Sequence, residues 1–90
     1  MNKDTDKIQK YLRLIAQPVR LHILLILRHG ELCVCDIYEK LNLSQNLTSH
    51  HLKLLTDLQL LNRRNEGVKV LYSRNEKTIS EYKRLLDNTL

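Results

Sequence analysis

The chain has 90 residues, a formal net charge of +5 and an isoelectric point near 9.4. This length supports one modest hydrophobic core, so we expect a single domain over residues 1–90 that a partner subunit completes, and the basic charge favours nucleic acid as a further partner. The apolar run at 21–27, which His22 interrupts, is far shorter than the ~20 residues that cross a bilayer. The polar first residues also lack the apolar segment of a signal peptide. We therefore expect a soluble, cytoplasmic protein with no membrane partner.

Apolar residues recur every three or four positions in five segments, and this spacing predicts five helices. The second segment, which begins at Pro18 and ends at Gly30, is apolar nearly all round and should lie at the centre of the core. Only a short turn separates the third and fourth segments, which is the arrangement of a helix-turn-helix. The expected ranges are 4–16 with Thr5 as N-cap, 18–30, 33–41, 44–58 with Ser44 as N-cap, and 77–88.

A change of pattern after the fourth helix predicts a β-hairpin over residues 62–72. β-Branched and aromatic residues there follow a turn that contains Asn and Gly. Arg63, Arg64 and Lys69 lie around the tip and would make the hairpin a basic wing that reaches the DNA backbone. The expected fold is therefore mostly α-helical with a two-stranded wing, a winged helix-turn-helix.

The helix expected at 44–58 has a polar face that suits the major groove of DNA. Gln and Asn side chains can pair with adenine, a Leu can touch a thymine methyl, and Ser, His and Lys can reach phosphates or base edges. An ordinary amphipathic surface helix would show the same spacing, but the adjacent basic hairpin favours DNA. Thr48, Leu52 and Leu55 are expected to face the core, and the candidate DNA contacts on this helix are Gln45, Asn46, Leu47, Ser49, His50 and Lys53.

Two histidines in helical segments are expected to have structural roles. His51, one turn before Leu55, should pack between helices rather than bind a metal. His22, inside the apolar second segment, should be a hydrogen-bonded core residue. The sequence offers no Ser-His-Asp arrangement, Gly-rich phosphate loop or paired catalytic carboxylates, and we do not expect an enzyme.

The two cysteines, Cys33 and Cys35, lie at the start of the helix expected at 33–41, which is the first helix of the helix-turn-helix. Because side chains two residues apart in a helix diverge by about 200°, an ordinary disulfide is not expected in regular backbone, and a reducing compartment is the simpler interpretation. Near a helix N-terminus the thiolate form is favoured, and thiolates bind soft ions, whereas buried structural cysteines are the alternative. Binding by both sulfurs would distort the first turn and disfavour the DNA-bound spacing. Further candidate ligands are Asp36, His29, Tyr38, an added thiol or a residue of a second subunit.

Several motifs between Leu14 and Tyr72 occur together in one known family. They are Gln-Pro-Val-Arg-Leu at 17–21, Glu-Leu-Cys-Val-Cys-Asp at 31–36, Ser-Gln at 44–45, Ser-His-His-Leu at 49–52 and Gly-Val-Lys-Val-Leu-Tyr at 67–72. With these motifs the chain resembles the ArsR/SmtB family of metal-responsive winged-helix repressors. The resemblance implies a homodimer that binds operator DNA and leaves it when a toxic metal or metalloid binds. It also implies pairing through the first and last helices, with dimer contacts from Ile8, Leu12, Ile79, Tyr82 and Leu86.

The resemblance also suggests the inducer. The family's cysteine pair corresponds to Cys33 and Cys35, which implies arsenite or antimonite as the leading inducer and Cd, Pb or Zn as less favoured inducers. No ion is expected to be required for folding. Arsenic-responsive relatives often carry a third cysteine where this chain has Tyr38, and the zinc and nickel sites of the family use histidines that residues 76–90 lack. Two alternatives stay open: a repressor that senses oxidation or sulfide through its cysteines, and a non-DNA-binding interaction or metal-buffering module with the same fold.

Overall fold

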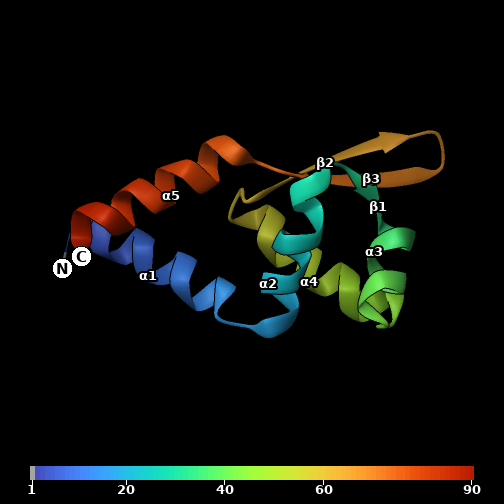
Figure 1. Cartoon of the computed structure of the whole chain (residues 1–90), viewed down its shortest axis with the longest axis horizontal. Helices are drawn as coiled ribbons and strands as arrows, with labels where there is room; N and C mark the ends of the chain where they lie inside the picture. Colours follow the sequence, from blue (N-terminus) through green and yellow to red (C-terminus); the bar gives the residue numbers. More distant parts are fainter. Residues whose placement is uncertain (1) are drawn as a thin grey trace.

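A computed structural model describes residues 2–90, in which five α-helices pack with a small antiparallel sheet (Figure 1). The helical pair α3–α4 forms the helix-turn-helix, and β2 and β3 form the wing beside it. The elements are α1 (Lys3–Ile15), α2 (Pro18–Ile26), a short 3-10 helix (Leu27–His29), β1 (Leu32–Cys33), α3 (Val34–Leu41), α4 (Gln45–Asp57), β2 (Leu61–Glu66), β3 (Lys69–Arg74) and α5 (Glu76–Thr89).

The helix ends follow from capping side chains. Ser44 caps α4 as predicted, because the Leu47 N–H donates to its Oγ at 3.1 Å. The predicted cap of α1 by Thr5 is wrong. Asn2, whose backbone is extended, accepts the Thr5 N–H at 2.8 Å and so starts the helix one residue earlier than expected. Between α3 and α4, Asn42 adopts the left-handed conformation, which an Asn side chain tolerates, and this allows the tight turn of the helix-turn-helix.

The sheet has three strands rather than the predicted two. Its order is β1-β3-β2, and β1 pairs with β3 through Leu32 opposite Tyr72 and Cys33 opposite Leu71. A strand of two residues is too short to show an alternating pattern, so only its pairing with a distant segment defines it. Within the wing, the turn contains Gly67 at φ +60°, a conformation that glycine adopts without strain.

The core lies between α2, α3 and α4. Its fully buried side chains include Ile23, Ile37, Leu52 and Leu55. The prediction that His22 lies in this core is wrong, because α2 meets the core through Ile23 and the adjacent Leu24, and His22 is exposed on the other side of the helix. Its Nδ1 lies 3.0 Å from the Pro18 carbonyl oxygen, so it is hydrogen-bonded only within its own helix.

The first and last helices pack on each other at one end of the molecule, where α1 begins and α5 ends (Figure 1). The rings of Tyr11 and Tyr82 stack with their centroids 4.6 Å apart, and Ile8 and Ile79 are buried nearby. Aromatic stacking of this kind adds to the energy of apolar burial. The α1–α5 pair therefore forms an end of the protomer that is separate from the wing.

Candidate nucleic-acid interface and thiol site

A cleft of about 410 Å³ lies between the start of α3, the start of α4 and the wing. Because α4 begins at Gln45, its N-terminal residues form one wall, and the wing forms the facing wall. The start of α3 contributes the cysteines and closes the end of the cleft. The lining residues used below are Cys33, Cys35, Tyr38, Gln45, Ser49, Arg63 and Lys69.

The outward and inward faces of α4 are as predicted. Thr48, Leu52 and Leu55 are buried in the core. The six candidate DNA contacts on this helix are all exposed, although Lys53 is held by Asp57 one turn later at 2.8 Å. The N-terminal part of α4 is thus presented to solvent at the edge of the cleft, as the base-reading part of a recognition helix must be.

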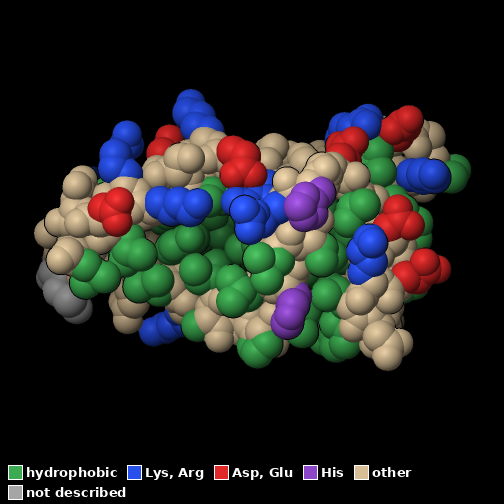
Figure 2. Space-filling model, in the orientation of Figure 1, with side chains coloured by type: hydrophobic (Ala, Val, Ile, Leu, Met, Phe, Trp, Pro, Cys, Tyr) green, Lys and Arg blue, Asp and Glu red, His purple; other side chains and the backbone are tan. Residues whose placement is uncertain are grey.

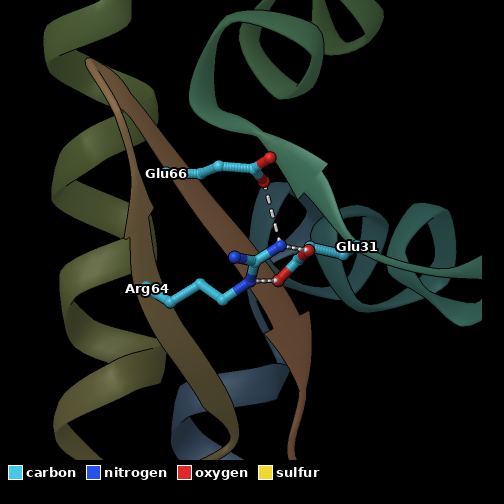
Figure 3. Close-up of polar contacts among 3 residues, drawn as sticks. All are labelled: Glu31, Arg64 and Glu66. Atoms are coloured by element: carbon cyan, nitrogen blue, oxygen red, sulfur yellow. Dashed lines mark hydrogen bonds and ion pairs between the residues drawn. The ribbon is translucent and has the colours of Figure 1, made fainter.

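The three wing cations have different environments. Arg63 and Lys69 line the cleft, and no carboxylate within residues 2–90 forms an ion pair with either of them. Arg64 instead donates two hydrogen bonds of 2.7 Å to Glu31 and one of 3.0 Å to Glu66 (Figure 3). These carboxylates raise the pKa of the Arg64 guanidinium, and its hydrogen bond lowers the pKa of Glu31. Arg63 and Lys69 are therefore the wing cations available for phosphates.

The expectation that Cys33 and Cys35 do not form a disulfide is wrong, because the structure joins them by one. Cys33 is not part of the helix. It is the N-cap of α3, with the extended backbone angles φ −76° and ψ 159°, and the two Cα atoms lie 5.3 Å apart. The helical divergence of positions i and i+2 does not apply there, and the argument for a reducing compartment that rested on it fails as well.

The same geometry brings three candidate metal ligands close together. The sulfur atoms of both cysteines and a carboxylate oxygen of Asp36 lie within 4.8 Å of one another. Cys33 is buried, whereas Cys35 and Asp36 are exposed, which leaves the group open to solvent. Of the other candidate ligands, Tyr38 lines the same cleft, whereas His29 lines a different cavity together with Lys40. A soft ion requires the reduced pair, because the thiolate is the metal-binding form.

Known proteins with similar sequences identify the family. Residues 17–63 match the family model described as "Bacterial regulatory protein, arsR family". The chain is 37% identical over 81 residues to the arsenical resistance operon repressor of Staphylococcus xylosus, and this alignment covers 90% of the chain and 78% of the relative. The chain belongs to the arsR family of bacterial regulatory proteins.

Solved structures agree with this assignment. The structure of HlyU from Vibrio cholerae matches that of this chain with a TM-score of 0.81 and 32% identity, and the match covers 94% of each chain. A homodimeric winged helix-turn-helix DNA-binding domain from Mycobacterium bovis has a TM-score of 0.77 at 23% identity, covering 94% of this chain and 80% of that one, and shows the fold alone. The predicted winged helix-turn-helix is confirmed, and membership of a family of transcription regulators agrees with the expectation that the protein is not an enzyme. No helix within residues 2–90 is long and apolar enough to span a bilayer.

Sequence reasoning missed the residue that anchors the recognition helix of this ArsR-family protein. The predicted packing of His51 is confirmed, since only 6% of its surface is exposed. Its partner is Arg20 of α2, whose Nε donates to His51 Nδ1 at 3.2 Å and whose Nη1 donates to the Leu14 carbonyl oxygen at 3.2 Å. Arg20 thus connects α1, α2 and α4. The only sequence signal for it is its place in the family motif at 17–21.

The contact between Arg20 and His51 predicts a pH effect on stability. Burial lowers the pKa of His51, and the nearby charges of Arg20 and His50 lower it further. Since the folded pKa lies below the unfolded value of about 6.5, the stabilising contribution is complete above that pH and is lost as the pH falls toward the folded pKa. In His51→Gln, the side-chain oxygen can still accept from Arg20 but does not titrate. Urea unfolding at pH 7.5 and 5.5 should therefore show a smaller loss of stability in the variant, and equal losses would contradict this role for His51.

Proposed function

We propose that this ArsR-family protein is a homodimeric repressor that binds operator DNA and is released when arsenite or antimonite binds at Cys33 and Cys35. One observation carries the proposal: the two cysteines and the start of the recognition helix line the same cleft. An ion held by the cysteines therefore lies next to the side chains that would contact the duplex, and a change at one affects the other locally.

In the proposed complex, the N-terminal part of α4 enters the major groove. Gln45 and Asn46 pair with base edges, Leu47 contacts a thymine methyl, and Ser49, His50 and Lys53 reach bases or phosphates nearby. Arg63 and Lys69 of the wing contact the backbone, since both are exposed and face the same cleft as Gln45.

The proposed dimer uses α1 and α5, as the resemblance implies. Ile8, Ile79 and Tyr82 are largely buried within the protomer, so they support the helix pair rather than offering new surface to a partner. Leu12, at 40% exposure, and the half-buried Leu86 remain available for the second copy. Figure 2 shows apolar side chains gathered along this end of the molecule and over α2, where Leu21 and Leu25 are also exposed. The homodimer named for the Mycobacterium bovis domain supports this assembly.

Arsenite and antimonite fit the donor set as inducers. The reduced pair supplies two soft thiolates, and Asp36, Tyr38 or an added thiol completes the site. The S. xylosus relative is named for arsenical resistance, which supports these ions ahead of Cd, Pb or Zn. Cys33 caps α3 by accepting the Asp36 N–H at 3.3 Å, so binding at its sulfur changes the first turn of the helix that leads into α4.

A second candidate is oxidation sensing by the same cysteines, and the disulfide between Cys33 and Cys35 favours it. In that case an oxidant such as peroxide takes two electrons from the two thiols, two protons leave, and the disulfide forms. The signal is then the redox state or a sulfide adduct of the pair, and DNA release needs no metal ion. Either role belongs in the cytoplasm, where the DNA is.

An operator-release assay tests the proposal and separates it from the alternatives. Duplex carrying the promoter of the protein's own gene is bound by reduced protein and titrated with arsenite, antimonite, Cd, Pb and Zn, and the experiment is repeated with protein oxidised by peroxide. Release of reduced protein by arsenite supports the metalloid repressor, and release by oxidation alone supports the second candidate. Binding with no preference over random duplex would leave only an interaction or metal-buffering module.

The wing prediction concerns salt dependence. Arg63→Ala is expected to weaken binding to every duplex and to lower the slope of log K against log salt by about one per protomer, because one phosphate contact is lost. Lys10→Ala removes the same charge from the exposed surface of α1, far from the wing, and is the control. Fluorescence anisotropy over about 50–300 mM salt, a range in which such slopes are resolved, measures both variants. An unchanged slope in Arg63→Ala would remove this residue from the backbone contacts.

A further inference from the structure

The contact between Glu31 and Arg64 joins the cysteine segment to the wing. Arg64 lies on β2, and Glu31 immediately precedes β1, with β3 between the two strands. The Arg64 guanidinium reaches across β3 and donates to both carboxylate oxygens of Glu31 at 2.7 Å. It also donates a third hydrogen bond, of 3.0 Å, to Glu66, which lies on β2 with Arg64 (Figure 3). A two-bond arginine–carboxylate pair fixes orientation as well as distance.

The strand register places this pair beside the cysteine. Leu71 of β3 is opposite Arg64 on one side and opposite Cys33 on the other, so the three residues form one row across the sheet. Only Leu32 separates Glu31 from Cys33 along the chain. Because β1 has two residues, a displacement of Cys33 carries Glu31 with it, and the pair passes that displacement to β2.

We infer that Glu31 and Arg64 are a positioning pair that transmits the state of the cysteines to the wing. The inference deepens the proposed function and rests on it. When the cysteines take an ion, Cys33 and β1 move, Glu31 draws Arg64 with it, and the neighbouring Arg63 leaves the phosphate position. Without the pair, the ion site fills while the wing keeps its DNA-bound position.

Two properties suit the pair to this role. The hydrogen bond from Arg64 lowers the pKa of Glu31, so the carboxylate stays ionised and the contact persists into mildly acidic conditions. Both side chains are partly exposed, at 54% for Arg64 and 31% for Glu31, and exposed pairs contribute little to folding stability. Removing one partner therefore tests position without unfolding the protein.

The experiment compares Glu31→Gln with Glu76→Gln. The control removes the same charge from a similar pair, in which Arg74 Nε lies 2.7 Å from a Glu76 oxygen where β3 meets α5. For each protein, DNA affinity is measured empty and with saturating arsenite, and arsenite affinity is measured without DNA. Glu31→Gln should bind DNA without arsenite, and arsenite without DNA, with affinities within about threefold of the wild type. The loss of DNA affinity that arsenite causes should, however, be about tenfold smaller than in the wild type. Glu76→Gln should behave like the wild type.

A second readout does not depend on release by arsenite. Amide hydrogen exchange in β2 is compared between the disulfide and dithiol forms, and it should differ in the wild type and not in Glu31→Gln. If the wild type is not released by arsenite but shows this difference, the proposed inducer fails and the positioning pair stands. The inference is overturned if amide exchange in β2 of the wild type is the same in the disulfide and dithiol forms. It is also overturned if arsenite releases Glu31→Gln and the wild type from DNA equally.

Discussion

Replacing both Cys33 and Cys35 with serine is expected to leave operator binding intact and to abolish its response to arsenite. Hydroxyl groups do not supply the thiolates that a soft ion requires. Coupling between an effector and a second ligand is typically about 5–150-fold, and the whole of that factor should disappear. Anisotropy titrations of labelled operator with and without arsenite measure it.

Serine is the appropriate substitution because of where Cys33 lies. Its sulfur accepts the Asp36 N–H as the N-cap of α3, and a serine hydroxyl is among the best N-cap acceptors. Cys33→Ala would remove the cap together with the thiol. Comparing it with the serine variant therefore separates the effect of the lost cap from the effect of the lost thiol. Arsenite release that survives in the double serine variant would rule out these cysteines as the sensor.

Gln45→Ala is expected to cause a large loss of affinity at the operator and little loss on random duplex. Gln45 is the first residue of α4, exposed and on the wall of the cleft, where a side chain can reach a base edge. A lost base contact costs about 1–3 kcal/mol, and the proposed dimer loses two, for roughly 2–6 kcal/mol in total. Competition titrations with operator and scrambled duplex give the two affinities.

The control for this prediction is Arg63→Ala, which should weaken binding to operator and scrambled duplex alike because phosphates carry no sequence information. Asn46→Ala should resemble Gln45→Ala, since Asn46 is exposed at the same end of α4. Equal losses on operator and scrambled duplex for Gln45→Ala would place the base-reading residues elsewhere on the helix.

The sequence predicts those parts of the structure that depend on local periodicity and capping. The inward side of α4 at Thr48, Leu52 and Leu55, and its start at Ser44, follow from helical spacing and one hydroxyl cap. These features need no knowledge of distant segments.

The features that the sequence does not predict all depend on contacts between distant segments or on the conformation of one residue. β1 exists because Leu32 and Cys33 pair with residues of β3 about forty positions later, and the pairing of Arg64 with Glu31 spans 33 positions. The disulfide depends on the extended backbone of Cys33, which a helical prediction over 33–41 does not contain. Such contacts are set by tertiary packing, which leaves no periodic signal.

The α1–α5 pair and the α3–wing region lie toward opposite ends of an elongated protomer, 43 Å along its longest axis (Figure 1). Substitutions that adapt the cleft to another trigger therefore leave the α1–α5 end unchanged. A change of inducer at the cleft would thus leave the proposed dimer contacts as they are.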